Sequence, residues 1–199
     1  MFSLVLIGSG GHASSVMDVI SRIKKIKIIG YVDKKENNFI DLNYLGSDEN
    51  LNQIFGKCNK AHISIGHVKS NSVRKRLFYK LKKIGFQFPI IKSSSAIISK
   101  NSELQEGSII MENVILNHGS KIGYNCIINN KALIEHDSVI GNNCHISTGA
   151  LINGNVKIGD DVFIGSGSII NNNISIGKKC FINSGKTINR NLLDYEIIK

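Results

Sequence analysis

A branched aliphatic residue recurs at every sixth position through the second half of the chain, with no break in phase. The series is Ile98, Leu104, Ile110, Leu116, Ile122, Ile128, Ile134, Ile140, Ile146, Ile152, Ile158, Ile164, Ile170, Ile176, Ile182 and Ile188. A period of six does not match the 3.6-residue period of a helix face. Units this short bury their apolar residues only by stacking, which is typical of a parallel β-solenoid. We predict a triangular coil of hexapeptide repeats over residues 93–199, with residues eighteen apart stacked vertically.

Turn-forming residues separate the aliphatic positions, as in Asn153-Gly154-Asn155 and Ser166-Gly167. Gly, Asn and Asp tolerate the positive φ angles that tight corners need.

Cys126, Cys144 and Cys180 share one stacking column, and the chain has no C-x-x-C pair. We therefore expect the cysteines to be small core residues in a reducing compartment, not disulfides or metal ligands.

Residues 1–92 follow a different pattern, which alternates strands and helices around a glycine-rich loop. The expected elements are a strand at 2–7, a loop at 8–13, a helix at 14–23, a strand at 26–32, a strand at 61–65, a helix at 68–84 and a final strand at 86–91. We therefore predict an α/β, Rossmann-like half domain followed by an all-β parallel β-helix.

The Gly8–Ala13 loop joins the first strand to the first helix, and Asp33 ends the second strand about twenty residues later. Backbone N–H groups at a helix start favour phosphate oxygens, and an acidic residue at this spacing can meet a ribose or base. The second half of a dinucleotide fold is replaced here by the solenoid, so one nucleotide is favoured over NAD. The alternative is a glycine turn that only packs the helix against the strand.

Composition excludes some classes of function. The formal net charge is +10, but the lysines are scattered and no compact basic face with interleaved aromatics appears, which argues against nucleic-acid binding. No apolar run approaches the length of a membrane span, and no signal peptide is evident, so we expect a cytoplasmic protein with no membrane partner.

The segment Ile134-Glu135-His136-Asp137 is the best candidate for chemistry in the coil. Ile134 points inward by the repeat frame, so His136 and Asp137 lie at a corner. A histidine there can act as a general base, and an adjacent carboxylate can orient its ring. Gly154 lies one coil above His136 and leaves room beside it, and a glycine N–H there suits a developing oxyanion. The alternative is that His136 is only a polar turn residue.

His118 lies one coil below His136 and has no evident partner, whereas His145 is expected at a neighbouring corner or on the face beside it. These three histidines leave open a zinc-dependent hydratase that gathers them across a subunit interface. A non-catalytic β-helical scaffold is a further alternative.

The chain resembles the sialic acid O-acetyltransferase and nucleotide-aminosugar N-acetyltransferase family, the NeuD/PglD-like left-handed β-helix enzymes. The resemblance rests on the Gly8–Ala13 loop, Tyr31-Val32-Asp33, Ile63-Ser64-Ile65-Gly66, the Ile134–Asp137 segment and Gly154-Asn155-Val156-Lys157-Ile158-Gly159. It implies a left-handed coil, a homotrimer, a nucleotide-sugar substrate on the N-terminal unit and acetyl-CoA along the coil between neighbouring subunits. It implies no metal.

The resemblance also assigns residues. His136 matches the base and Asp137 the acidic residue that tunes it. Nucleotide-sugar contacts fall at Gly10, Gly11, His12, Asp33, Lys34 and Gly66, with Gly8 and Ser9 in the same loop. The acetyl-CoA groove is implied at His145, Gly154, Ser166 and Ser184.

Two departures from the family pattern are visible. Lys34 stands where some members carry a second acidic residue, and the closing segment with a Gly-x-Pro-Ala-type turn has no counterpart. Because that segment helps to cover the cofactor in the family, we expect either weaker acetyl-CoA binding or a truncated copy. The predicted function is acetyl transfer from acetyl-CoA to the amine of a nucleotide-linked amino sugar for bacterial surface glycans, with O-acetylation of a sialic acid as the alternative.

Overall fold

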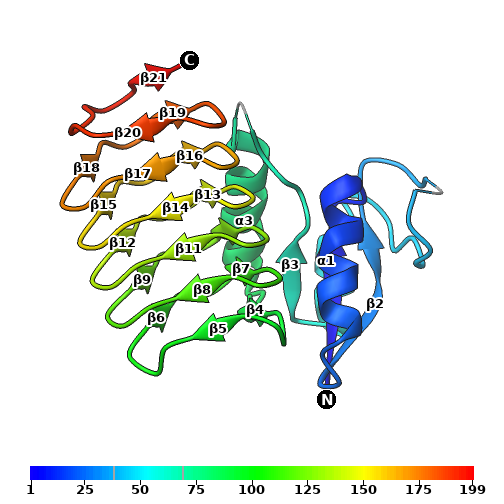
Figure 1. The fold of residues 1–199 in the computed structure, drawn as a ribbon. Coiled ribbons are helices and arrows are strands. Elements are labelled where there is room, and N and C mark those ends of the chain that lie inside the picture. The colour runs from blue at the N-terminus through cyan, green and yellow to red at the C-terminus, as the bar shows by residue number, and fades with distance from the viewer. Residues whose placement is uncertain (38, 69) are drawn as a thin grey trace. The chain divides into compact units, whose positions relative to one another are not determined.

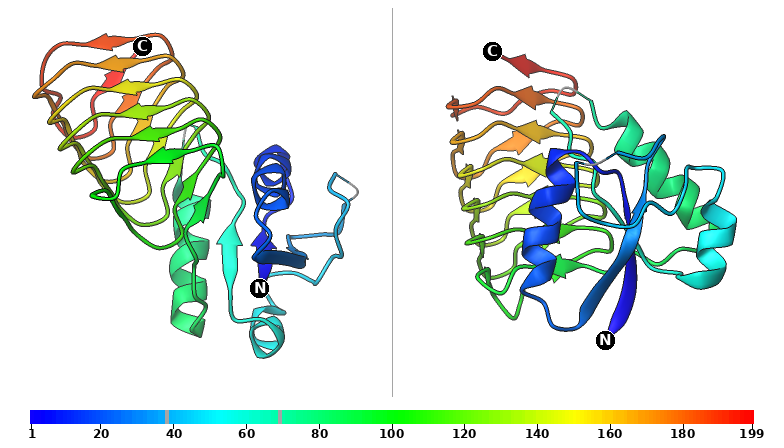
Figure 2. Two further views of the ribbon diagram at one scale, coloured as in Figure 1. Left: turned by 60° about the horizontal axis from the view of Figure 1, so that its bottom comes forward. Right: turned by 90° about the vertical axis from the view of Figure 1, so that its right-hand side faces the viewer.

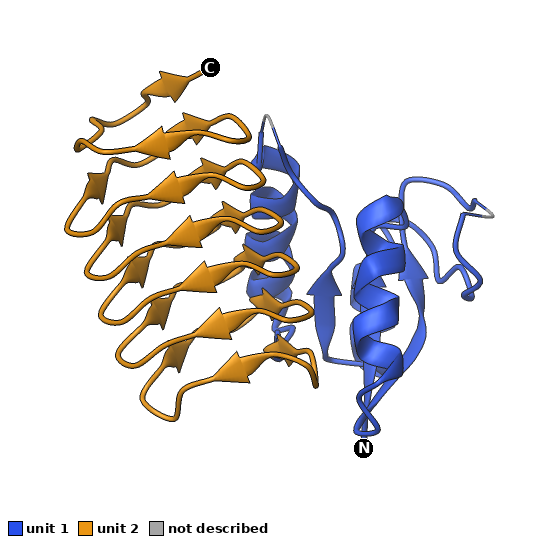
Figure 3. Ribbon diagram, in the orientation of Figure 1, with its two compact units in different colours: residues 1–89 blue, residues 90–199 orange. Residues whose placement is uncertain are grey.

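The computed structural model describes residues 1–37, 39–68 and 70–199, and divides into two compact units (Figures 1 and 3). Unit 1 spans Met1–Pro89 and unit 2 spans Ile90–Lys199. No helix in the described part of the chain is long and apolar enough to cross a membrane.

Unit 1 is a three-stranded parallel sheet in the order β2-β1-β3, with helices on both faces (Figure 2). Its elements are β1 (Phe2–Ile7), α1 (Gly11–Ser21), β2 (Ile26–Val32), α2 (Leu51–Lys57), β3 (Ala61–Ile63) and α3 (Ser72–Ile84). Side chains alternate across the strands, so Val5 and Ile7 pack with Leu77 and Leu81 of α3. The predicted order of strands and helices up to α3 is confirmed, although α1 begins three residues early and β3 is two residues shorter.

The final strand predicted over 86–91 does not form, and this prediction is wrong. Gln87 makes only an isolated bridge with Lys60, while Phe86 and Phe88 are buried in the core of unit 1. Pro89 has no N–H to give to a sheet. Ile91 and Lys92 instead form β4, which pairs with β7 as the first strand of the coil. The helix predicted from residue 68 begins at Ser72, and residue 69 of that prediction lies outside the described residues.

Unit 2 is a parallel β-solenoid of two-residue strands in three sheets (Figure 1). The seven-stranded sheet holds β4 (Ile91–Lys92), β7 (Ile109–Ile110), β10 (Ile127–Ile128), β13 (His145–Ile146), β16 (Phe163–Ile164), β19 (Phe181–Ile182) and β21 (Ile197–Ile198). The six-stranded sheet holds β5 (Ile97–Ile98), β8 (Ile115–Leu116), β11 (Leu133–Ile134), β14 (Leu151–Ile152), β17 (Ile169–Ile170) and β20 (Thr187–Ile188). The five-stranded sheet holds β6 (Glu103–Leu104), β9 (Lys121–Ile122), β12 (Val139–Ile140), β15 (Lys157–Ile158) and β18 (Ser175–Ile176).

The stacking period is the one expected from the sequence. Ile134 pairs in register with Leu116 below and Ile152 above, and these residues are fully or almost fully buried in one apolar core. Each buried aliphatic side chain of this size contributes about 1.5–3 kcal/mol to folding. The corners turn through residues with positive φ, such as Asn113, Asp137 and Gly167.

The small residues at the corners also serve as hydrogen-bond donors. Ser108 Oγ donates to Gly123 O at 2.6 Å, and the thiols of Cys126 and Cys144 donate to Gly141 O and Gly159 O at 3.0 and 3.1 Å. Burial raises the pKa of the Cys144 thiol. All four cysteines are free and buried, which confirms the interior packing predicted for them.

His62 of β3 gives unit 1 an expected sensitivity to acid. Its ring is fully buried, and burial, followed by the charges of Arg74 and His12, lowers its pKa well below the ordinary value. Below about pH 6.5 the unfolded chain therefore binds a proton that the folded chain resists, and stability falls by up to about 1.4 kcal/mol per pH unit. Urea unfolding at pH 7.5 and 5.5 measures this loss.

The His62→Leu variant should flatten the dependence, since it removes the buried titrating group. His118→Gln is the control, because His118 is exposed on the coil. An unchanged slope in His62→Leu would contradict the assignment.

Candidate active site

The corner between β11 and β12 holds His136 and Asp137, and its backbone is fixed by the coils on either side. Asp137 adopts a φ of 59°, and its N–H donates to His118 O at 2.9 Å. The carbonyl of His136 accepts the Asn155 N–H, also at 2.9 Å. The buried Ile134 anchors the start of the turn, so the two polar side chains project outward from a rigid frame.

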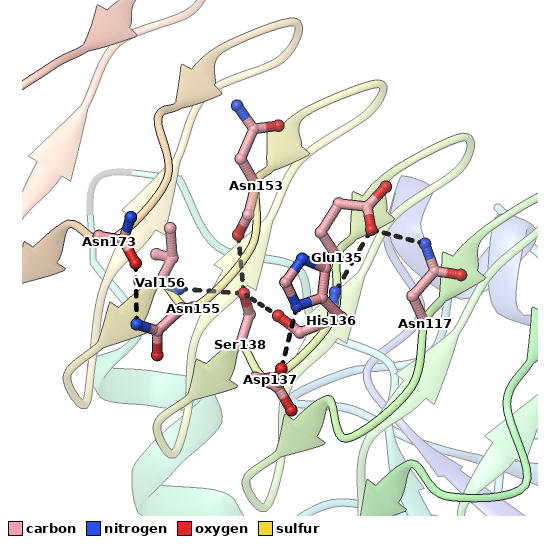
Figure 4. A network of polar contacts seen from close by, with 9 residues as sticks. All are labelled: Asn117, Glu135, His136, Asp137, Ser138, Asn153, Asn155, Val156 and Asn173. Atoms are coloured by element: carbon pink, nitrogen blue, oxygen red, sulfur yellow. Dashed lines mark hydrogen bonds and ion pairs between the residues drawn. The ribbon is translucent and has the colours of Figure 1, made fainter.

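The two side chains form a hydrogen-bonded pair (Figure 4). His136 Nδ1 lies 2.9 Å from Asp137 Oδ2, and the side chains are 59% and 62% exposed. A carboxylate accepts a hydrogen bond, so the neutral ring carries its proton on Nδ1. Nε2 is then left unprotonated and can accept a proton from a substrate. The structure thus brings the predicted base and its orienting acid together.

Neighbouring polar groups support this pair. Glu135 Oε2 accepts the Asn117 side-chain N–H at 2.8 Å and lies 3.3 Å from the His136 backbone N (Figure 4). The Ser138 hydroxyl donates to Asn153 O at 2.7 Å and accepts the Val156 N–H. No role was predicted for Asn117, Glu135 or Ser138. Their spacing of fifteen to eighteen residues is the signal that would have indicated these contacts.

Gly154 leaves open the space beside the His136 ring. A Cβ atom built on Gly154 would lie 2.6 Å from His136 Nε2, closer than real Cβ atoms approach. The prediction that Gly154 makes room for His136 is confirmed. Any larger residue at this position would push against His136 Nε2.

The other two coil histidines lie in different settings. His118 Nδ1 lies 3.0 Å from the side-chain nitrogen of Asn101, so the histidine that seemed to have no partner does have one. His145 lies within β13 on the seven-stranded sheet, 6% exposed, with its ring 5.2 Å from that of Phe163. Its Nε2 lies 3.3 Å from the Asn129 side-chain nitrogen. Among the described residues, no group of three His, Cys, Asp or Glu side chains could hold a metal ion.

Ser166 and Ser184 lie at another corner, between the seven-stranded and six-stranded sheets. The Gly185 N–H donates to Ser166 O at 2.9 Å, which confirms that the two serines share a column. Three glycines with φ near 66° follow one another along this corner, at Gly149, Gly167 and Gly185, and a Cβ on any of them would meet nothing within 4 Å. The His136 corner lies at the opposite edge of the same six-stranded sheet.

The glycine loop of unit 1 is shaped by close approaches. Gly8 has a φ of 103°, and a Cβ there would lie 2.4 Å from Ile65 Cγ1. A Cβ on Gly66 would lie 3.2 Å from His12 Cβ, whereas Gly10 and Gly11 face open space at the start of α1. Glycine at residues 8 and 66 is thus explained by packing, while Gly10 and Gly11 leave the helix N-terminus accessible.

Asp33 makes contacts that were not predicted from the sequence. Its Oδ2 accepts both the N–H and the hydroxyl of Ser9, at 2.9 and 2.5 Å, and its Oδ1 accepts the Lys34 N–H at 2.7 Å. The Asp33 carboxylate therefore ties the Gly8–Ala13 loop to the end of β2.

A small cavity lies at the carboxyl ends of the unit 1 strands, where ligands bind in open α/β sheets. Its lining consists of Ile7, Gly8, Val32, Asp33, Lys34, Asp48, Ile65, Val73, Arg76 and Leu77. Asp48 Oδ2 lies 3.6 Å from an Arg76 nitrogen and 3.3 Å from Lys80 Nζ. Sequence reasoning missed Asp48 and Arg76, since only the fold brings them to the end of β2.

Comparison with known proteins agrees with both halves of this description. Residues 3–81 match the PglD N-terminal domain, and residues 155–190 match the bacterial transferase hexapeptide (six repeats). The chain therefore carries a PglD N-terminal domain followed by bacterial transferase hexapeptide repeats. No curated protein matches the chain.

Among solved structures, the chain is similar to PerB from Caulobacter crescentus in complex with CoA and GDP-perosamine. The two are 27% identical with a TM-score of 0.92, and the alignment covers 99% of this chain and 93% of that chain. The acetyltransferase domain of PglB from Neisseria gonorrhoeae, in complex with acetyl coenzyme A, is 23% identical with a TM-score of 0.90, covering 98% and 94%. WeeI from Acinetobacter baumannii is 23% identical with a TM-score of 0.83 and the same coverage. At 23% identity, the similarities to PglB and WeeI indicate a shared fold only.

Proposed function

We propose that this protein transfers the acetyl group of acetyl-CoA to the amine of a nucleotide-linked amino sugar used in bacterial surface glycans. The observation that carries the proposal is the His136–Asp137 pair, whose free Nε2 faces the space left by Gly154. PerB, described as a GDP-perosamine N-acetyltransferase, spans nearly the same fold. That relative favours an amine acceptor over a hydroxyl of a sialic acid.

The mechanism follows from the geometry of the pair. As the sugar nitrogen attacks the thioester carbon, His136 Nε2 takes the proton from the amine, and Asp137 stabilises the resulting imidazolium. The carbonyl electron pair moves to oxygen in the tetrahedral intermediate. When the C–S bond breaks, this pair re-forms the carbonyl, and the CoA thiolate leaves with the proton that His136 returns. A positioned base of this kind contributes about 10²- to 10⁴-fold to the rate.

We place the nucleotide sugar on unit 1, at Gly8, Ser9, Gly10, Gly11, His12, Asp33, Lys34 and Gly66. The open start of α1 offers backbone N–H groups to phosphates, and Lys34 and Arg76 supply positive charge beside the cavity. Asp33 holds the Gly8–Ala13 loop in place through its hydrogen bonds with Ser9. It therefore shapes the nucleotide-sugar site as well as contacting the ligand.

We place acetyl-CoA along the coil at His145, Gly154, Ser166 and Ser184. The corner with Ser166 and Ser184 supports this placement, because its glycines keep side chains away from the backbone over three coils. Elsewhere on the coil the same positive φ is adopted by Asn, Asp and Lys, so the backbone geometry alone does not demand glycine. Close approach of an elongated ligand explains the choice.

The Gly167→Asn variant tests this placement. Asparagine adopts the required φ at Asn113 on the same corner, so the melting temperature should stay within a few degrees of the parent value. The added side chain would project into the groove, and the Kd for acetyl-CoA measured by calorimetry should rise by at least about tenfold, or about 1.4 kcal/mol.

Lys131→Asn is the matched control, since residue 131 already carries a side chain at this corner with a φ of 60°. Unchanged acetyl-CoA affinity in Gly167→Asn would exclude this corner as the groove.

We further propose that the protein is a homotrimer. An aliphatic column runs down the outer side of the six-stranded sheet and is exposed or only partly buried within one chain, at Ile97, Ile115, Leu133, Leu151 and Ile169. The five-stranded sheet presents mostly polar residues instead, including the ion pair of Lys121 and Glu103, with Val139 as an exposed apolar exception. Burying the aliphatic column between copies would bring the Ser166–Ser184 corner of one chain near the His136 corner of another.

A cytoplasmic location, where acetyl-CoA is available, is consistent with four free cysteines.

The proposed function is tested by incubating the purified protein with acetyl-CoA and a panel of UDP-, GDP- and dTDP-linked amino sugars. Release of the CoA thiol and addition of one acetyl group to the sugar, seen by mass spectrometry, are expected for at least one member. Matched sugars with a hydroxyl in place of the amine distinguish N- from O-transfer. A protein that neither binds acetyl-CoA nor acetylates any member would be a scaffold.

A further inference from the structure

His136, Gly154 and Asn172 occupy the same corner position in three successive coils, eighteen residues apart. Because Gly154 has no side chain, the side chains above and below it face one common space. A Cβ built on Gly154 would lie 2.6 Å from His136 Nε2 and 3.2 Å from Asn172 Nδ2. The ring nitrogen and the amide nitrogen of Asn172 thus lie on either side of the place that a Cβ of residue 154 would take, which we call the gap.

Asparagine or aspartate at this position has a different role on the other corners. Its side-chain oxygen accepts the backbone N–H of the residue one coil below. The pairs are Glu112 with Asn130 at 3.1 Å, Tyr124 with Asn142 at 3.0 Å and Asn142 with Asp160 at 2.6 Å. Near the end of the coil, Lys178 donates to Asp194 in the same way, at 2.8 Å.

Asn172 departs from this pattern next to the base. It turns its amide nitrogen toward residue 154, and the expected bond from the Gly154 N–H is not made. Within the described ranges, neither the Asn172 side chain nor the Gly154 N–H has a hydrogen-bond partner. Two donors are therefore free on the side of the gap that lies opposite His136 Nε2.

We propose that the Asn172 side-chain N–H, together with the Gly154 N–H, stabilises the oxyanion of the tetrahedral intermediate, which makes Asn172 a catalytic residue. This inference rests on the proposed acetyl transfer. The new C–N bond forms on the His136 side as the base takes the amine proton, and the carbonyl pair moves to oxygen on the Asn172 side. The same pair re-forms the carbonyl when the C–S bond breaks. Donors fixed where charge develops are worth most in the transition state.

The Asn172→Asp and Asn172→Ala variants test the proposal through kcat and KM for both substrates. Aspartate keeps the shape of asparagine and can accept the Gly154 N–H, as Asp160 accepts that of Asn142, but it has no N–H to donate. Both variants should lower kcat by about 10²- to 10³-fold, while each KM stays within about twofold of the parent value. Asn189→Ala, an exposed asparagine in the same coil domain, should leave both constants unchanged.

Near-parental kcat in Asn172→Asp would overturn the inference, because the residue would then serve only as an acceptor within the coil. A change confined to KM would overturn it as well. The parent enzyme and His136→Ala are assayed alongside. Parental turnover that is lost in His136→Ala supports the proposed function whatever Asn172 does. A parent protein that transfers no acetyl group removes both proposals.

Discussion

Replacing His136 with alanine should lower kcat for acetyl transfer by about 10²- to 10⁴-fold, a loss of roughly 3–5 kcal/mol of transition-state stabilisation. The reason is that His136 Nε2 is free to take a proton while Asp137 holds Nδ1 at 2.9 Å. Both side chains are more than half exposed, so their removal leaves no cavity in the core. Acetyl-CoA affinity and melting temperature should stay close to the parent values, as measured by calorimetry and thermal denaturation.

His118→Ala is the matched control for this prediction. His118 has the same position one coil below, but its ring is engaged by Asn101 and no space like that at Gly154 lies above it, because His136 itself occupies the next position. Turnover of this variant should remain within about threefold of the parent, within the range of an exposed substitution away from the chemistry. Near-full turnover in His136→Ala would reject His136 as the base.

Replacing Gly154 with alanine should abolish most activity while leaving the fold intact. The new methyl group would lie 2.6 Å from His136 Nε2, and its other near neighbours are His136 Cε1 and Asn172 Nδ2, all at the ends of side chains. These side chains can swing away, so stability changes little, but the base is displaced and the space for the tetrahedral centre is filled. We expect kcat to fall by at least about 10²-fold, since a misplacement of about 1 Å can cost that much.

Gly141→Ala provides the contrast. A Cβ there would lie 2.6 Å from the carbonyl carbon of Gly159, which belongs to the rigid backbone of the next coil. This variant should lose stability, seen as a lower melting temperature, because neither coil can shift without breaking the inner stack. If Gly154→Ala instead lost stability and kept its turnover, the space beside His136 would have a packing role only.

The corner position of His136 could be predicted because the solenoid repeats itself. Each inner residue, such as Ile134 or Ile152, lies in the same frame as the next, so counting along the chain locates the corners. The α/β order of unit 1 was predictable up to Ile84 for a similar reason, since apolar runs and glycine turns are local signals. The strand expected over 86–91 failed because its last residue, Ile91, pairs with Ile109 of the coil, and no local pattern reveals that competing partner.

Contacts within the site were less accessible to such reasoning. Asp33 was expected to meet a ribose or base, and no local pattern indicated that its carboxylate also accepts hydrogen bonds from Ser9, twenty-four residues earlier. His118 seemed unpaired, yet Asn101 reaches it from the coil below. The prediction that Ser166 and Ser184 share a column was correct. Only the sheet order shows that the whole six-stranded sheet separates their corner from the His136 corner.

The sequence alone determined the solenoid, its eighteen-residue stacking and the outward position of the His136–Asp137 pair. The aliphatic residue at every sixth position must point inward to be buried, and this determines which of the other positions in each repeat point outward. The tertiary structure alone decided which groups meet at each corner: the tautomer that Asp137 imposes, the gap at Gly154 and the amide that Asn172 turns toward it. These contacts join residues from different coils through side-chain rotamers and single hydrogen bonds, and the repeat period does not specify either.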